Sequence, residues 1–237
     1  MERAITQIEE YNKGYEKFKQ AYLEGKESKK SIEDITGDKR RCITLVHKIK
    51  ENTPLYEIVS AFSDILKDNF PEMYVQEIPH FTIDCHRYLK EPIEGQKIIT
   101  PEEFMIYNQI LKEEIGSLDS FPFEINGVSF GNDGLVAQVW YSPEALVDFN
   151  GRLGKKVREE VPSMDFEWGM AKNKIPIRVV NLARFTGNED KGKIIPLVDL
   201  LKETNFGEQI MGEMSLLESD HYIQKKNTKV LGDYQLK

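Results

Sequence analysis

Cysteine and long apolar runs are both scarce in this chain. Its 237 residues include two cysteines, Cys42 and Cys85, whose spacing fits neither a disulfide framework nor a zinc site. We expect both to be buried free thiols in a reducing compartment, the cytoplasm. No apolar segment approaches the ~20 residues of a membrane-spanning helix. The start of the chain, with Glu2 and Arg3, lacks the apolar core of a signal peptide, so we expect no membrane partner.

An excess of positive charge is also missing. The chain carries 32 Lys and Arg against 40 Asp and Glu, a formal net charge of −8. This balance argues against a partner such as long nucleic acid, whose binding depends on many cations. The overall charge does not exclude a small anionic ligand, because a local group of cations can oppose the overall sign. The hydrophobic content of 40% is that of an ordinary globular protein, long enough for a substantial core.

Residues 1–40 form a helical N-terminal extension in our interpretation. Aromatic residues recur there at helical spacing: Tyr11, Tyr15, Phe18 and Tyr22. We expect Gly25 to end this helix, and a second short helix to lie between Ser31 and Gly37. The aromatic stripe either packs on the rest of the chain or forms a lid or a protein contact, since tyrosine suits both.

Residues 41–237 are predicted to form one α+β domain. The order strand, helix, strand occurs at 42–86 and again at 135–185, which predicts two pseudo-symmetric halves of a bilobal sheet domain with a central groove. The hairpin signal at 132–134 joins strands at 121–130 and 135–141. Further elements are expected as helices at 54–68, 100–115, 143–153 and 196–204, a loop at 164–170, and strands at 175–185, 209–218 and 229–236.

A polar face on the strand at 80–86 is the feature that points to function. Side chains alternate along a strand, so one face carries His80, Thr82, Asp84 and His86. Buried polar groups cost free energy unless they are paired, and a wet groove over the sheet would relieve that cost. An imidazole and a hydroxyl two residues apart can both reach one phosphate. The alternative is a histidine satisfied by the fold and a threonine chosen for strand propensity.

Three local patterns carry a family resemblance. Residues 79–83 read Pro-His-Phe-Thr-Ile, residues 179–185 read Val-Val-Asn-Leu-Ala-Arg-Phe, and the chain ends with Gly-Glu-Met-Ser-Leu-Leu-Glu-Ser at 212–219 and Tyr-Gln-Leu at 234–236. With the repeated strand–helix–strand order, these resemble the two-histidine phosphoesterases, which include 2'-5' RNA ligase-like proteins and cyclic phosphodiesterases. The first pattern fits the His-x-Thr motif of that superfamily. In the second, Val179 stands at the place of the second histidine and Asn181 at that of the threonine.

The resemblance implies a metal-independent chemistry without a cofactor. In the family, one imidazole takes a proton from the attacking group and the other gives one to the leaving oxygen, while the two threonines hold the phosphate. Here the resemblance makes His80 a catalytic acid or base and Thr82 a phosphate ligand. The Asn181 amide can still donate a hydrogen bond to phosphate. A positioned acid or base is worth about 10²–10⁴ in rate, so loss of one should weaken catalysis severely.

Other histidines are poor replacements for the missing one. His86 lies about 20 Å along the strand from His80, too far to share a phosphate. We interpret His47, in an apolar strand, as structural. His221 follows Asp220 in a predicted loop, and we expect it to be solvated.

Three residues are considered as further substrate ligands. Tyr141, at the end of its predicted strand, can reach the groove. Arg178 and Arg184 flank the altered motif, and arginine binds phosphate through a fork of donors. By strand alternation, however, both point away from the Asn181 face, and Arg184 is as well explained as an ion-pair partner. We retain Tyr141 and Arg184, with Asn181, as candidate substrate-binding residues.

Three hypotheses for function follow. In the first, the chain is a phosphodiesterase-like protein that acts weakly on a nucleotide or short RNA end with a 2',3'-cyclic or 2'-5' phosphodiester. Alternatively, it is an inactive nucleotide-binding sensor or sponge, because Val179 cannot transfer a proton. The third possibility is a scaffold that contacts another protein through the aromatic N-terminal helix. Retention of His80 and Thr82 favours the first hypothesis, and Val179 favours the second.

Overall fold

The structure is a computed structural model and describes residues 2–92, 97–161 and 178–237. The loop predicted at 164–170 and the beginning of the strand predicted from residue 175 lie outside these residues. Within the described residues, nine strands form one antiparallel sheet in the order β7-β4-β5-β6-β3-β1-β8-β9, with β2 paired to β6. The strands are β1 (Arg41–Lys48), β2 (Tyr74–Val75), β3 (His80–Lys90), β4 (Phe121–Phe130), β5 (Gly134–Tyr141), β6 (Arg178–Arg184), β7 (Asn205–Met211), β8 (Glu213–Ser219) and β9 (Lys229–Gln235).

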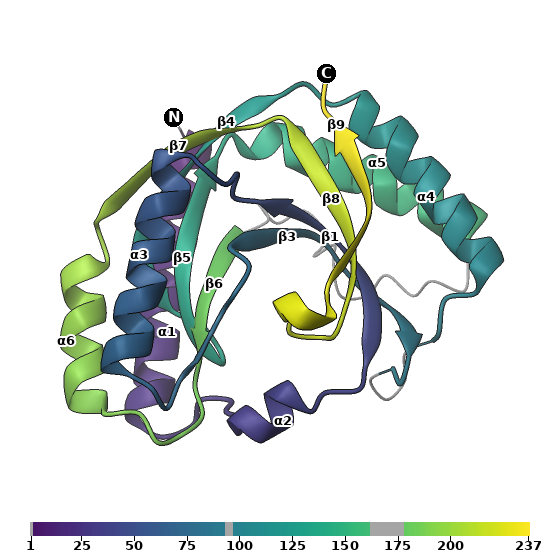
Figure 1. The fold of residues 1–237 in the computed structure, drawn as a ribbon. Coiled ribbons are helices and arrows are strands. Elements are labelled where there is room, and N and C mark those ends of the chain that lie inside the picture. The colour runs from purple at the N-terminus through teal and green to yellow at the C-terminus, as the bar shows by residue number, and fades with distance from the viewer. Residues whose placement is uncertain (1, 93–96, 162–177) are drawn as a thin grey trace.

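Helices flank this sheet. They are α1 (Glu2–Leu23), α2 (Ile32–Thr36), α3 (Pro54–Asn69), α4 (Pro101–Gly116), α5 (Pro143–Glu160) and α6 (Lys191–Leu201), with a 3₁₀ turn η1 (Lys225–Asn227). Figure 1 shows α1, α3 and α6 grouped on the β5 and β6 side and α4 and α5 on the β8 and β9 side. The sheet curves between the two groups, and the turn between β8 and β9 lies in the middle of the curve. The predicted α+β class is confirmed.

Caps fix the starts of α3 and α4 as the sequence predicts. The Thr53 hydroxyl accepts a hydrogen bond from the backbone N–H of Tyr56 at the start of α3. At the start of α4, Thr100 and Glu103 form a reciprocal capping box. Proline occupies the first turn of both helices, where its missing N–H has no helical partner in any case. Each helix therefore begins where local chemistry alone would start it.

The aromatic stripe of α1 packs on the main domain. Tyr11, Tyr15 and Tyr22 are buried, and Phe18 is partly buried against the same core. The Tyr22 ring is fully buried and stacks on Phe185 with ring centroids 4.5 Å apart. Tyr15 donates to the Asp199 carboxylate of α6, and Lys19 pairs with the same carboxylate at 2.6 Å. Packing on the domain, one of the two expectations for this stripe, is confirmed.

Some predicted boundaries near the C-terminus are wrong. Helix α6 begins at Lys191, capped by the Asp190 side chain, and Pro196 lies inside it instead of starting it. The strand predicted at 209–218 is two strands, β7 and β8, which separate at Gly212. The short strand β2 was not predicted. Its two residues follow a helix and a turn, and only their pairing with β6 defines them as a strand.

The packing of α1 leads to a stability prediction. Replacing Tyr22 by alanine should lower the free energy of unfolding by about 3–5 kcal/mol, the usual cost of removing a buried aromatic ring. Ile8 of the same helix is 39% exposed, and Ile8→Ala should change it by less than about 0.5 kcal/mol. Urea unfolding of both variants measures the difference. Equal, small effects would show that α1 does not stabilise the domain.

Candidate functional site

The two halves of the sheet meet where β3 pairs with β6. Phe81 lies opposite Val180 in this antiparallel ladder. The flanking positions therefore place His80 beside Asn181, and Thr82 beside Val179, on the opposite face from Phe81 and Val180. We call the face that carries these four side chains the motif face. The predicted neighbourhood of the strands bearing His80 and Asn181 is thus present, and Val179 does stand next to the His-x-Thr residues.

A β-bulge brings Arg184 onto the motif face, which corrects the expectation from simple alternation. Along β5, Val136 pairs with Asn181, but the next residue, Leu135, pairs with Ala183. The extra residue, Leu182, shifts the alternation of β6 by one position. Arg184 then pairs with Gly134 on one side and with Tyr74 on the other. Asn181 and Arg184 consequently face the same way, and Tyr74 joins them.

His80 is buried in a defined tautomer. Its side chain is 2% exposed, and Nδ1 lies 2.7 Å from the carbonyl oxygen of Ile78. A carbonyl can only accept, so Nδ1 carries the proton and Nε2 carries the lone pair. Burial lowers the pKa of His80 to about 4. The hydrogen bond to Ile78 acts to raise this pKa, and the charge of Arg184 acts to lower it. At neutral pH the imidazole is therefore neutral, which suits a proton acceptor and not a donor.

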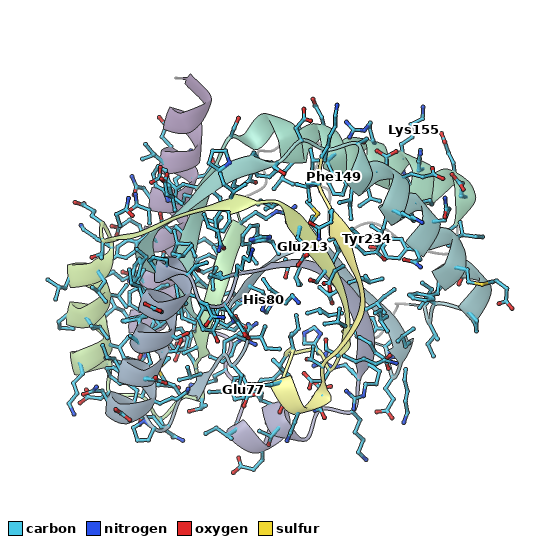
Figure 2. All side chains as sticks on the ribbon, turned by 45° about the horizontal axis from the view of Figure 1, so that its top comes forward. Glu77, His80, Phe149, Lys155, Glu213 and Tyr234 are labelled. Atoms are coloured by element: carbon cyan, nitrogen blue, oxygen red, sulfur yellow. The ribbon has the colours of Figure 1, made fainter. Side chains whose placement is uncertain are left out.

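The other residues of the motif face can hold an anion. Thr82 and Asn181 are half-buried, and both carry a hydrogen-bond donor. Arg184 pairs with Asp133 through Nη1 and lies over the Tyr222 ring, 5.9 Å from its centroid. Figure 2 shows His80 inside the curve of the sheet, with Glu77 nearer the turn between β8 and β9. The arrangement joins one proton acceptor to neutral and charged donors.

Tyr141 and Arg178 lie on the other face. Tyr141 pairs with Phe123, is buried in the hydrophobic core, and packs against Phe121. Arg178 pairs with the core residue Val139. Burial raises the pKa of the Tyr141 phenol to about 12, although the neighbouring charge of Arg178 acts to lower it. The structure does not bring Tyr141 to His80, so we leave it out of the proposed site. For Arg178 the expectation from alternation holds.

The connection between β8 and β9 is part of the site, and no local sequence pattern indicates this. The Nε2 atom of Gln76 donates to the backbone carbonyls of Tyr222 and Ile223, both at 3.2 Å. Ile223 is 2% exposed and packs in a cluster with Val46, Leu217 and Ile78. Val46 pairs with Thr82 across β1 and β3, so Ile223 covers the motif face next to the threonine.

This connection holds an unusual backbone conformation. Ile223 has a φ of 54°, in the left-handed region that β-branched residues rarely adopt. Asp220 fixes the turn, because its Oδ1 accepts from the backbone N–H of Tyr222 and Gln224 and its Oδ2 from the side chain of Asn227. Such strain costs on the order of 1–3 kcal/mol and persists only where the surroundings enforce it.

The expectation of a solvated His221 is wrong. Its ring stacks on Tyr88, and its Nδ1 lies 3.0 Å from the Tyr88 hydroxyl. Burial, followed by the charge of Arg40, lowers the pKa of His221 to about 4. Arg40 also lies over the Tyr222 ring and forms an ion pair with Asp38. His221 therefore belongs to a packed aromatic and cationic cluster beside the motif face, because the β8–β9 connection folds back over the sheet.

Of the remaining expectations, those for His47 and Cys42 are confirmed and those for Cys85 and His86 stay predictions. The expectation that Asp84 shares the face of Thr82 is wrong, because a bulge in β3 pairs Asp84 with the core residue Leu45, and Asp84 accepts from the Tyr107 hydroxyl. His47 is structural, as predicted: its Nδ1 lies 2.7 Å from the Glu213 carbonyl, and its ring contacts Phe81 and Phe123. The side chains of Cys85 and His86 lie outside what the structure describes, whereas Cys42 is a buried free thiol, as expected. Among the described residues, no group of three or more His, Cys, Asp or Glu could hold a metal ion.

Comparison with known proteins adds evidence for the fold. By sequence, the chain matches no protein-family model and no curated protein. By structure, it is similar to TT0787 of Thermus thermophilus, with a TM-score of 0.54 and 16% identity, covering 82% of this chain and 97% of that one. E. coli LigT in its apo form gives a TM-score of 0.51 at 13% identity, with 83% and 98% of the two chains covered.

Two more structures agree with these. LigT complexed with 3'-AMP gives a TM-score of 0.51 at 11% identity, over 84% of this chain and 99% of that one. A protein solved as a phosphoesterase gives 0.52 at 11% identity over the same shares. The chain therefore shares the fold of LigT, and at these identities the likeness concerns the fold alone. Within the described residues, none of the helices is long and apolar enough to cross a membrane.

Burial of His80 predicts a pH dependence of stability. The unfolded chain binds a proton at His80 near pH 6.5, whereas the folded chain does so only near pH 4. Between these values the unfolded state holds more protons, so stability falls as pH is lowered, by at most about 1.4 kcal/mol per pH unit for one histidine.

Urea unfolding at pH 7, 6 and 5 tests this expectation. His80→Gln removes the titrating group, so its free energy of unfolding should fall less with acidification than that of the parent chain. Parallel curves for the two proteins would contradict a buried, neutral His80.

Proposed function

We propose that this protein binds the phosphodiester or phosphate of a nucleotide or RNA end on the motif face and hydrolyses 2',3'-cyclic phosphates slowly, without a metal. The observation that carries the proposal is the position of His80, whose neutral imidazole lies beside the Asn181 amide and Thr82 in one cross-strand group. The shared fold with LigT, which has been solved with 3'-AMP, supports a nucleotide as the ligand.

His80 is the proton acceptor in this proposal. Its Nε2 takes a proton from a water molecule as the water oxygen bonds to phosphorus and the bond to one ribose oxygen breaks. Thr82 and Asn181 donate hydrogen bonds to the non-bridging oxygens and hold the phosphate in line. Val179 has no proton to give, so the leaving oxygen takes one from solvent. The missing acid makes the reaction slow, by about 10²–10⁴ relative to a paired site.

The second candidate function is binding without turnover. Ile223 packs against Val46, the residue paired with Thr82, and His80 is only 2% exposed, so the proton acceptor is buried in the ligand-free protein. A nucleotide sensor or sponge needs the donors of the motif face but not a proton transfer. The two candidates predict the same ligands and differ only in the fate of the phosphate.

Kinetic assays on 2',3'-cyclic nucleotides, with a chelator present, separate these candidates. Slow turnover that His80→Ala abolishes, with binding retained, supports hydrolysis. The double variant Val179→His with Asn181→Thr should then raise the rate by up to about 10²–10⁴, less what imperfect placement loses. Asn181→Thr alone is the control, because it restores the hydroxyl without the second imidazole.

The same experiment can reject either candidate. Tight binding of 3'-AMP with no turnover in the parent chain or the double variant would leave the sensor. Absence of both binding and turnover for every phosphate ester tested would remove the proposal altogether.

A further inference from the structure

Two hydrogen-bond donors on the motif face have no acceptor. The Tyr74 hydroxyl and the Arg184 Nε–H are both buried, and neither has a hydrogen-bond partner among the residues that the structure describes. An unsatisfied buried polar group costs about 1–3 kcal/mol, so such donors are rare without a reason. Here two occur together, since Tyr74 and Arg184 are directly opposed in the pairing of β2 with β6.

Their shared position places both donors near His80. Directly opposed residues of an antiparallel pair point to the same side, with Cβ atoms about 4.5–5.5 Å apart. The bulge at Leu182 puts that side on the motif face, with Asn181. The positive charge of Arg184 acts to lower the pKa of both His80 and His221. The pair therefore extends the motif face at the end nearest the β8–β9 connection.

Nearby carboxylates do not satisfy these donors, because they bind other groups. Asp133 engages the Nη1 edge of Arg184 and leaves the Nε edge without an acceptor. Asp220 accepts from the turn of the β8–β9 connection, and Glu77 accepts from the backbone N–H of Lys225 at 2.8 Å. Burial raises the pKa of the Tyr74 phenol, so it remains a donor at all physiological pH values.

We propose that Tyr74 and Arg184 together bind a phosphate oxygen of the ligand. This inference rests on the proposed function and adds Tyr74, which the family resemblance does not assign, to the anion-binding residues. An oxyanion accepts both donors at once, and the guanidinium supplies the charge that Thr82 and Asn181 lack.

Tyr74→Phe tests the proposal with a minimal change. It removes the hydroxyl and keeps the ring, so the affinity for 3'-AMP and for inorganic phosphate, measured by calorimetry, should fall about fivefold to tenfold. The melting temperature without ligand should stay the same or rise, because an unsatisfied buried hydroxyl is removed. A structural hydroxyl would give the reverse pattern, with a lower melting temperature and unchanged affinity.

Tyr22→Phe is the matched control. The Tyr22 hydroxyl is also buried without a partner in the described part of the chain, but it lies on α1, over Phe185. This variant should change the melting temperature in the same way as Tyr74→Phe and leave both affinities unchanged.

A double-mutant cycle tests whether the two donors act together. It adds Arg184→Lys and the double variant Tyr74→Phe with Arg184→Lys. Lysine keeps the charge but has no Nε–H, so phosphate affinity should fall. If both donors hold one anion, the combined loss differs from the sum of the single losses.

The outcomes distinguish this inference from the proposed function. If the parent chain binds phosphate and 3'-AMP and Tyr74→Phe binds them equally well, the pair is not an anion site and the proposed function stands. If the parent chain binds neither, both fail.

Discussion

The pairing of Phe81 with Val180 is the interaction on which the rest of this structure depends. It is the point where two strand–helix–strand halves become one antiparallel sheet. The two side chains point into the core, which forces their neighbours onto the other face. His80, Thr82, Val179 and Asn181 are brought together by that alternation alone. A shift of β6 by one residue in register would turn Val179 and Asn181 toward the core and Val180 away from it, and would separate both polar positions from His80 and Thr82.

Burial determines what His80 can do. The carbonyl of Ile78 fixes the tautomer, and the low-dielectric surroundings hold the ring neutral. A site with two imidazoles can keep one as base and one as acid, but this chain has Val179 in place of the second. The cations that remain, Arg184 on the motif face and Arg40 beside it, are paired with Asp133 and Asp38. The motif face therefore has one neutral imidazole and no second one to return a proton.

Local patterns in the sequence predict most of the fold and the centre of the site. Capping residues, the turn at 132–134 and strand alternation indicated the elements, and the His-x-Thr pattern indicated His80 and Thr82. What local patterns missed depends on distant contacts. The bulge at Leu182 exists because β6 pairs with β5, and it reversed the expectation for Arg184. His221 looked solvated because a loop sequence does not show that the β8–β9 connection is tied back to Gln76.

The most direct test of this account is a crystal structure of the protein with 3'-AMP bound. The account predicts phosphate oxygens within about 3 Å of the Thr82 hydroxyl and the Asn181 amide, with His80 Nε2 facing the phosphorus. His80 is 2% exposed, so the side chains around it should be displaced from their ligand-free positions in that complex. A phosphate bound elsewhere, with His80 still buried, would contradict the claim that the motif face is the functional site.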